Sequence, residues 1–414
     1  MGKCSCRRPV AASALAGSAA GARPCGAPGV APAGGLSSNT PPQTSKSDEM
    51  TGGEDWLEWS ACVDWGTTWP AMRDKLVRGK ECAQDRKLAN DTGWDVLTFG
   101  DLTLCVEPEG KRVGKGRKGQ YFAFRLTETE NTVQIQDRNK PNGTRPNVMV
   151  RSNGMACLTW GGMGCLERGR NILRAMGAII VKERLSRVDM ALDLPGVDMD
   201  EFVAAFQERR YITRAKGRGF HESSGITIYL GKSPLMIRIY DKAAEMQSCR
   251  NPVKEFYMMN RRWHGVIPEK AIRVEFELGR QALKEHGIDT PDDYFRKRAD
   301  LAAYLCGEWV RFTACAVDRT HTSLMAVLPL WLTVADGFKE WTGKPACLPL
   351  TPLDHGQIDV SQLEKQAVGV FLTAALTSGK ATTVQTFRKY CGQAVEKRMP
   401  EPQFQRETKR RCGA

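Results

Sequence analysis

The feature that most constrains the fold is a set of three short segments that alternate apolar and charged residues with a period of two. They are Arg187–Leu194, Ile237–Lys242 and Arg273–Leu278. Successive side chains of a β-strand point to opposite faces of a sheet, so each segment separates into an apolar face and a charged face. The pattern predicts three amphipathic strands. If they share one sheet, its polar face carries these residues: Arg187, Asp189, Asp193, Arg238, Tyr240, Lys242, Arg273, Glu275 and Glu277.

Composition divides the chain of 414 residues into three parts. Residues 1–50 are rich in Ala, Gly, Pro and Ser and contain no aromatic residue, which predicts a disordered tail. An export signal, a lipidation signal at Gly2 and a true start at Met50 are the alternatives. Residues 51–290 are predicted to form an α+β domain, an antiparallel sheet with helices packed on one face, and residues 291–414 a smaller helical C-terminal domain.

Hydrophobic periodicity and turn residues predict further elements. Strands are expected at Trp56–Trp65 (an edge or early strand), Asp101–Val106, Tyr121–Leu126, Asn147–Ser152, Ile226–Leu230 and Leu235–Tyr240. Helices are expected at Cys165–Met176, Asp200–Glu208, Lys242–Ser248, Tyr294–Leu305, Leu363–Leu376 and Thr382–Lys397. The four residues Gly-Lys-Ser-Pro between the last two strands predict a hairpin in which Ile228 lies opposite Ile237 and Thr227 opposite Arg238.

The net charge of the chain is +13, of which residues 1–50 contribute only +3. This excess of positive charge favours a polyanionic partner, and a basic protein with a solvated surface is the alternative. One predicted loop packs five cations into eight residues: Lys111, Arg112, Lys115, Arg117 and Lys118. They predict a phosphate-binding loop, and a disordered charged turn is the alternative.

The 14 cysteines are scattered along the chain, and no two of them form a C-x-x-C pair. Their spacing argues against a zinc ribbon, a dithiol redox motif and, in a chain this long, a disulfide framework. Free thiols in a reducing cytoplasm fit best. No segment has the ~18–20 continuous apolar residues of a membrane span, so a cytoplasmic protein without a membrane partner is predicted.

Four segments follow one another along the chain: RVDMALDL, TIYLG, IRIYDKAAE and RVEFELGRQAL. In this order and at this spacing the sequence resembles the replication initiation factor family, the rolling-circle initiators of bacterial plasmids and filamentous phages. The likeness covers roughly Trp56 to Gly279, with a shorter match near Trp331–Trp341. It implies a protein that nicks one strand of origin DNA through a covalent 5′-phosphotyrosine. Such a protein leaves a free 3′ hydroxyl for polymerase and later rejoins the strand.

The resemblance implies roles for residues of the predicted polar face. Tyr240, in the segment RIYDK, corresponds to the nucleophile. The carboxylates of Asp189, Glu275 and Glu277 correspond to the ligands of a divalent metal. Many other rolling-circle nickases hold their metal with a His-hydrophobe-His motif, which this chain lacks. Hard oxygen ligands point to Mg²⁺ or Mn²⁺.

The chemistry of a phenol explains why cations are expected beside the nucleophile. A free tyrosine has a pKa of about 10 and is a poor nucleophile at neutral pH unless nearby cations stabilise the phenolate. Arg238 and Lys242 flank Tyr240 at i ± 2 on its own face and are predicted catalytic partners. Arg273 is a candidate for a bidentate contact with a DNA phosphate. Tyr229, across the predicted hairpin, is the rival nucleophile.

The residues leave more than one function open. The first is a metal-dependent nickase and strand transferase that binds double-stranded origin DNA and single-stranded DNA. The second is a non-cutting origin-binding initiator or repressor whose carboxylates are cross-strand ion pairs on a solvated sheet face. A conjugative relaxase is a weaker third, since the chain has no G-x-x-x-x-G-K-[ST] loop. A host helicase, a polymerase and a second copy of the chain are further expected partners.

Overall fold

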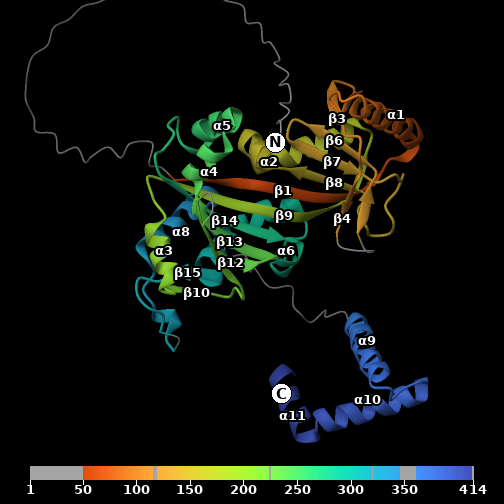
Figure 1. Cartoon of the computed structure of the whole chain (residues 1–414), viewed down its shortest axis with the longest axis vertical. Helices are drawn as coiled ribbons and strands as arrows, with labels where there is room; N and C mark the ends of the chain where they lie inside the picture. The colour runs from red at the N-terminus through yellow and green to blue at the C-terminus, as the bar shows by residue number, and fades with distance from the viewer. Residues whose placement is uncertain (1–49, 115–118, 223–224, 319, 346–359, 413–414) are drawn as a thin grey trace, which may run out of the picture. The chain divides into compact units, whose positions relative to one another are not determined.

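A computed structural model describes residues 50–114, 119–222, 225–318, 320–345 and 360–412 (Figure 1). Its main feature is an 11-stranded sheet with the strand order β11-β12-β13-β14-β9-β1-β8-β7-β6-β3-β2. Neighbouring strands are antiparallel throughout. The strands are β1 (Thr51–Asp64), β2 (Asp95–Phe99), β3 (Leu102–Val106), β6 (Phe124–Glu128), β7 (Asn131–Ile135), β8 (Val148–Ser152), β9 (Ile179–Pro195), β11 (Arg218–Glu222), β12 (Ile226–Lys232), β13 (Leu235–Asp241) and β14 (Ala271–Gly279). The predicted α+β class with an antiparallel sheet is confirmed.

Strands β1 and β9 lie side by side at the centre of the sheet (Figure 1). Their pairing runs from Thr51 opposite Asp193 to Asp64 opposite Ile179, with irregularities in register at three places. The prediction of an edge or early strand at Trp56–Trp65 is half correct. β1 comes early in the chain, but it has a partner on both sides, because β9 and β8 pair with it.

Helices cover the apolar face of the sheet. They are α1 (Trp69–Leu88), α2 (Gly154–Ala175), α3 (Asp200–Gln207), α6 (Arg280–Glu285), α7 (Pro291–Tyr304) and α8 (Pro329–Thr342). Their apolar residues form one core with strand residues, including Leu57, Trp59, Met190, Leu192, Phe276, Trp331 and Phe338. Burial of such side chains contributes roughly 1.5–3 kcal/mol each and is the main force that holds these helices on the sheet.

Helices α7 and α8 belong to the same packed unit as the sheet. Trp341 of α8 lies so close to Gly52 of β1 that a Cβ atom at Gly52 would overlap its ring. On the opposite face, Arg262 lies equally close to Gly53. Helices α7 and α8 therefore supply apolar cover for β1 and β9, and the domain boundary at residue 290 stays a prediction.

Two short helices cover one end of the polar face, α4 (Lys242–Cys249) and α5 (Pro252–Arg262). Helix α4 starts directly after β13 because the side chain of Asp241 accepts a hydrogen bond of 2.8 Å from the backbone N–H of Ala244. In α5, Asn251 caps the first turn in the same way, and Pro252 occupies the first helical position, where a missing N–H costs nothing. The rest of the polar face has no helix over it among the described residues.

The β12–β13 hairpin has the predicted faces but a different register. Thr227 lies opposite Tyr240 and Ile228 opposite Ile239, a shift of two residues from the predicted pairs. The cause is the turn, since pairing continues to Lys232 and Leu235 and leaves only two residues between the strands. A shift of two keeps each side chain on its own face, so the sorting into polar and apolar faces is unaffected.

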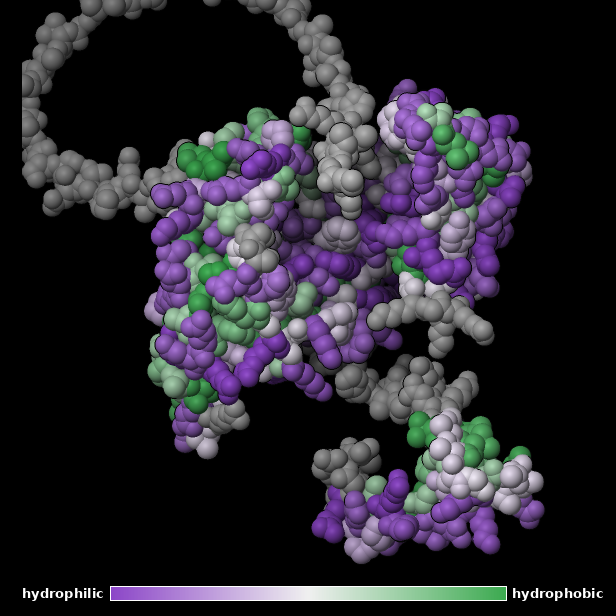
Figure 2. Space-filling model, in the orientation of Figure 1, coloured by the Kyte–Doolittle hydropathy of each residue, from purple (hydrophilic) through white to green (hydrophobic). Residues whose placement is uncertain are grey.

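The remaining elements lie outside the large sheet. They are β4 (Lys111–Val113), β5 (Gln120–Phe122), β10 (Tyr211–Thr213), β15 (Val310–Phe312), α9 (Val360–Thr377), α10 (Val384–Arg398) and α11 (Glu401–Cys412). Figure 2 shows hydrophobic residues gathered on α9. No helix in the described part of the chain has the length and apolar content of a membrane span. The predicted disordered tail, residues 1–50, lies outside the described residues except for Met50.

Candidate active site on the polar sheet face

The register of β12, β13, β14 and β9 brings the predicted site residues onto one face. Tyr240 lies opposite Arg273, and Arg238 lies opposite Glu275. Glu277 lies opposite Asp189 on the next strand. Because neighbouring positions on one face are about 5–8 Å apart, these side chains can contact one another. Tyr229 lies opposite Arg238 on the same face, but its hydroxyl makes no hydrogen bond with a described residue.

Tyr240 is held by a carboxylate. Its hydroxyl donates a hydrogen bond of 3.1 Å to Oε2 of Glu275, and Glu275 itself is buried. Burial raises the pKa of the Tyr240 hydroxyl well above its usual value, and the charge of Glu275 adds to the rise, whereas Arg273 opposes it. The phenol is therefore neutral at physiological pH. Its proton points at a group that can accept it.

Two arginines bind all three predicted metal ligands. Arg187 donates to both oxygens of Asp189, at 2.8 and 2.6 Å, and to Oε2 of Glu277 at 2.9 Å. Arg238 donates to Oε1 of Glu275 and lies 3.4 Å from Glu277 and 3.5 Å from Asp189. The five side chains form one network, which we call the arginine–carboxylate cluster.

The cluster contains three acidic side chains and two basic ones, so one carboxylate lacks a full counter-charge. Burial raises the pKa of Asp189 to about 7, and the charges of Glu275 and Glu277 add to the rise, although hydrogen bonds from Arg187 oppose it. Asp189 is 3% exposed, so water contributes little to its stabilisation. Its proton occupancy changes near neutral pH.

The cluster does not provide a metal site in this arrangement. Carboxylate oxygens have the right chemistry for Mg²⁺ or Mn²⁺. However, the point on which the carboxylates of Asp189, Glu275 and Glu277 converge is occupied by a guanidinium nitrogen of Arg238, which lies within 3.5 Å of all three. Arg187 and Tyr240 donate further hydrogen bonds to these carboxylates. No group of three or more His, Cys, Asp or Glu residues in the described ranges is arranged to hold a metal ion. The metal assignment stays a prediction.

Lys242 is the first residue of α4 and lies beside Tyr240. Its Nζ atom is 5.6 Å from the centroid of the Tyr240 ring and 2.6 Å from Oε2 of Glu245. Lys254 of α5 binds the other oxygen of Glu245 at 2.7 Å. Burial and the charge of Arg273 lower the pKa of Lys242, against the effects of Asp55 and Glu245. The predicted cation beside Tyr240 is thus in contact range of the ring, although it is almost fully buried.

Arg273, a predicted phosphate contact, has a different position from the one expected. It is fully buried and donates to both oxygens of Asp193, at 2.5 and 2.7 Å, and to Asp55 at 2.8 Å. Burial opposes the charged form, but Asp193 and Asp55 raise the pKa of Arg273 well above its usual value. In this structure Arg273 is therefore a buried structural cation with Met258 of α5 against it, and the phosphate contact stays a prediction.

The predicted phosphate-binding loop is only partly described. Lys115, Arg117 and Lys118 lie outside the described residues. Lys111 and Arg112 are in β4, where Arg112 is exposed and donates to the backbone oxygen of Gly119 at 3.3 Å. Partial burial and the nearby charges of Arg151 and Arg125 lower the pKa of Lys111. Both described residues can reach a bound polyanion, and the assignment stays a prediction.

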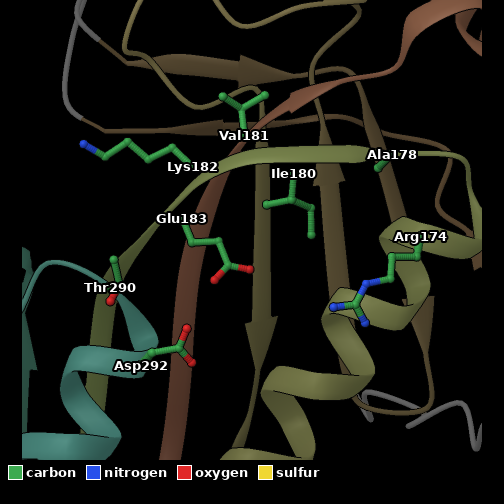
Figure 3. A pocket seen from close by; sticks show the side chains of 8 residues that line it. All are labelled: Arg174, Ala178, Ile180, Val181, Lys182, Glu183, Thr290 and Asp292. Atoms are coloured by element: carbon green, nitrogen blue, oxygen red, sulfur yellow. The ribbon is translucent and has the colours of Figure 1, made fainter.

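A pocket of about 560 Å³ lies at the start of β9, away from these residues (Figure 3). Its lining includes Arg174 of α2 and Asp292 of α7. Figure 3 shows the carboxylates of Glu183 and Asp292 pointing toward each other, and Arg170 donates to both, at 2.5 and 2.9 Å. The pocket contains no predicted site residue, and its two carboxylates are both paired with Arg170.

Sequence reasoning did not name two residues of this face as site residues. Arg187 was placed on the polar face, but only the register shows that it binds Asp189 and Glu277. Trp56 was assigned only to a strand. The structure places it opposite Asp189, with the guanidinium of Arg187 5.1 Å from its ring centroid. The sequence could have indicated that Trp56 lies on the polar face. It has charged neighbours at Glu54, Asp55 and Glu58, which are unusual around a core tryptophan.

Comparison with known proteins finds matches among the solved structures. No family model and no curated protein matches the chain. The chain is similar to the solved structure of a rolling circle replication initiator protein from Geobacillus stearothermophilus, with 15% identity and a TM-score of 0.41. The match covers 72% of this chain and 100% of that chain.

Proposed function

We propose that the protein is a rolling-circle replication initiator that nicks one strand of origin DNA with Tyr240. The observation that carries this proposal is the hydrogen bond of 3.1 Å from the Tyr240 hydroxyl to Glu275. It joins a nucleophile to a proton acceptor on a sheet face that also holds arginine side chains. The motif resemblance supports the same reaction, and the net charge of +13 suits a nucleic acid partner.

In the proposed reaction the phenol oxygen of Tyr240 attacks the phosphorus of the scissile phosphodiester, and the bond from phosphorus to the 3′ oxygen breaks. The phenol proton passes to Glu275 and then to the departing 3′ oxygen. The products are a 5′-phosphotyrosine and a free 3′ hydroxyl, so atoms and charge balance without another reactant. The reverse sequence rejoins the strand, because the phosphotyrosine conserves the energy of the broken bond.

The neighbouring cations have defined parts in this proposal. The pKa of Tyr240 is raised, so attack requires that the proton leaves as the bond forms and that positive charge faces the developing anion. Arg238 is two residues from Tyr240 on its face and already contacts Glu275. We assign it to the scissile phosphate. Lys242, 5.6 Å from the ring centroid, stabilises negative charge on the phenol oxygen.

A metal remains a separate part of the proposal. We predict Mg²⁺ or Mn²⁺ from the motif resemblance, and its ligands would be Asp189, Glu275 and Glu277. These carboxylates bind arginines in the present arrangement, so no step of the reaction above is assigned to a metal. Partners beyond DNA, namely a host helicase, a polymerase and a second copy of the chain, also stay predictions.

A non-cutting origin-binding initiator or repressor is the second candidate, and one observation favours it. Every predicted metal ligand has an arginine partner, and the pKa of Tyr240 is raised, which are properties of a structural polar cluster. Such a protein would bind DNA with the same cations. It would have no need for the Tyr240 hydroxyl.

A nicking assay on supercoiled DNA that carries the native origin separates the two candidates. Wild type, Tyr240→Phe and Tyr229→Phe are incubated with Mg²⁺ or Mn²⁺, and protein–DNA adducts are resolved on a denaturing gel. We expect an adduct with wild type and Tyr229→Phe and none with Tyr240→Phe, while all three bind the DNA equally. Tyr229→Phe is the matched control, because that tyrosine lies on the same face of the neighbouring strand.

Other outcomes would change the assignment. An adduct that survives in Tyr240→Phe and disappears in Tyr229→Phe would move the nucleophile across the hairpin. Specific binding of origin DNA without a nick by any of the three proteins would favour the non-cutting initiator.

A further inference from the structure

Trp56 lies on the polar face of the sheet, next to the arginine–carboxylate cluster. It is half-buried on β1 and lies opposite Asp189 of β9. Two guanidinium groups lie over its indole ring, with the central carbon of Arg187 at 5.1 Å and that of Arg151 at 5.3 Å from the ring centroid.

The apolar core does not account for this position. The core lies on the other face of β1, where Leu57 and Trp59 are fully buried. The indole N–H of Trp56 has no hydrogen-bond partner among the described residues, whereas buried polar groups are nearly always paired. The core tryptophans Trp59 and Trp65 likewise have no described partner for the indole N–H, so what distinguishes Trp56 is that its ring packs against two guanidinium groups on the polar face.

A continuous series of contacts joins Trp56 to the nucleophile. Arg187 contacts both the indole ring and Glu277. Arg238 contacts Glu277 and Glu275. Glu275 accepts the hydrogen bond of Tyr240. Three strand intervals of about 4.8 Å separate β1 from β13, so the indole lies on the order of 14 Å across the sheet from the strand of the nucleophile.

The side of the face beyond Trp56 carries further cations. Arg151 pairs with Glu58 at 2.6 Å, and Lys111 lies near enough to Arg151 for their charges to interact. Arg184, opposite Ser60 on β1, has no ion-pair partner in the described part of the chain. A strand of nucleic acid running from Tyr240 over this face would meet guanidinium groups at Arg238, Arg187 and Arg151 in turn.

Aromatic rings flanked by arginines on a sheet face are suited to single-stranded nucleic acid. Bases stack on aromatic rings and on guanidinium planes, and the same arginines contact phosphates. Duplex DNA hides the faces of its bases in the helical stack, so a stacking position requires an unpaired strand. The chemistry therefore selects a single strand and not a duplex at Trp56.

We propose that Trp56, together with Arg151 and Arg187, binds an unpaired base of the DNA strand that is to be cut. The inference rests on the proposed function, since it takes Tyr240 as the other end of the path. It adds a site that holds the strand in place beside the reaction. Trp56 is a positioning residue and does not touch the reacting atoms.

Fluorescence anisotropy with the full-length protein tests the proposal. The probes are a fluorescein-labelled oligothymidylate and a labelled strand of the same length whose sugars carry no bases. Stacking contributes about 1–3 kcal/mol per base, so we expect Trp56→Ala to weaken binding of the oligothymidylate about 5- to 150-fold. Binding of the abasic strand, which has phosphates only, should stay unchanged.

Matched variants guard against a loss of folding. Trp160→Ala removes another tryptophan that carries an arginine, Arg168 at 4.3 Å, but it lies on α2 and should leave both probes unaffected. Trp56→Leu keeps apolar bulk on β1 and should weaken oligothymidylate binding as Trp56→Ala does. Circular dichroism of each variant confirms that the fold is retained.

The outcomes separate this site from the function itself. Unchanged oligothymidylate binding by both Trp56 variants would overturn the site, and so would an equal loss for the two probes. If wild type nicks origin DNA through Tyr240 in either case, the proposed function stands without the site. A wild-type protein that binds no single strand and forms no adduct would overturn both.

Discussion

The hydroxyl oxygen of Tyr240 and the Oε2 atom of Glu275 lie 3.1 Å apart on the neighbouring strands β13 and β14. Their residues are not directly opposite, since Tyr240 faces Arg273 and Glu275 faces Arg238. The bond is therefore a diagonal contact that exists in only one register of the two strands. On the other side of β14, the ion pair of Arg273 with the directly opposite Asp193 fixes the register of β14 against β9.

Removal of the Tyr240 hydroxyl should destabilise the fold by a modest amount. Tyr240→Phe leaves Oε2 of buried Glu275 without its donor, which costs about 1–2 kcal/mol. Tyr229→Phe should change the free energy of unfolding by less than about 0.5 kcal/mol, since that hydroxyl has no described partner. Urea denaturation of both variants measures the difference. Equal stability would mean that the Tyr240–Glu275 bond contributes nothing.

Stability should fall with rising pH because of Asp189. Its pKa is about 7 in the folded protein against an ordinary value of 3.8, so the folded state binds the extra proton between these values. The contribution is fully present below pH 3.8 and is lost as pH rises through about 7. Thermal unfolding of wild type and Asp189→Asn across this range should show the loss in wild type only. If the stabilities of wild type and Asp189→Asn changed with pH in the same way, Asp189 would be ionised throughout this range.

Loss of Arg273 should destabilise the protein strongly. Arg273→Ala leaves the fully buried carboxylate of Asp193 without its partner, which costs roughly 3–5 kcal/mol. The control is Arg73→Ala at the exposed pair of Arg73 with Asp137, where a much smaller loss of stability is expected because solvent screens the two charges. Urea denaturation measures both. A DNA-binding defect in a stable Arg273→Ala variant would support the phosphate-contact prediction.

The arginines should suppress metal binding in the absence of DNA. Asp189 and Glu277 both accept hydrogen bonds from Arg187, so Mn²⁺ has to compete with a guanidinium for them. Arg187→Ala removes that positive charge, and we expect about tenfold tighter Mn²⁺ binding, measured by electron paramagnetic resonance of free Mn²⁺. Asp189→Asn combined with Arg187→Ala should cancel the gain. Tight binding by wild type would show that the arginines yield to the metal.

A chain that ends at residue 290 should not fold. It lacks α7 and α8, whose apolar residues Trp331 and Phe338 are buried in the common core. A chain of residues 50–345 keeps both helices and should unfold in one cooperative transition. Differential scanning calorimetry of the two chains distinguishes them. Cooperative unfolding of residues 50–290 would support the boundary predicted from the sequence.

The alternation of apolar and charged residues in the sequence was sufficient to predict which side chains of the central strands share a face of the sheet. Asp189, Tyr240 and Glu275 were predicted to share a face, and the register places them there. The hairpin register was missed because the turn is two residues long, which the segment Gly-Lys-Ser-Pro does not reveal. Helix α1 was not predicted, because its few buried residues, such as Met72 and Leu76, stand among many charged ones.

Packing between segments that are far apart in the chain could not be predicted from the sequence. The polar face of β14 was predicted to be open, but α5 folds over it and buries Arg273 against Asp193. Nothing near Arg273 in the sequence distinguishes it from Arg238, which stays partly exposed on the neighbouring strand. The partner of a charge in a sheet depends on the whole strand order, and that order depends on segments more than a hundred positions apart.

The contact of Trp341 with Gly52 has a consequence for synthesis of the protein. The ribosome makes β1 well before its neighbour β9 and its cover α8, which follow only much later in the chain. Pairings between distant segments form slowly, and an unpaired strand in a nascent chain is prone to aggregate. The central strand of this sheet must therefore stay without its final partners, or be bound by a chaperone, until translation has passed Trp341.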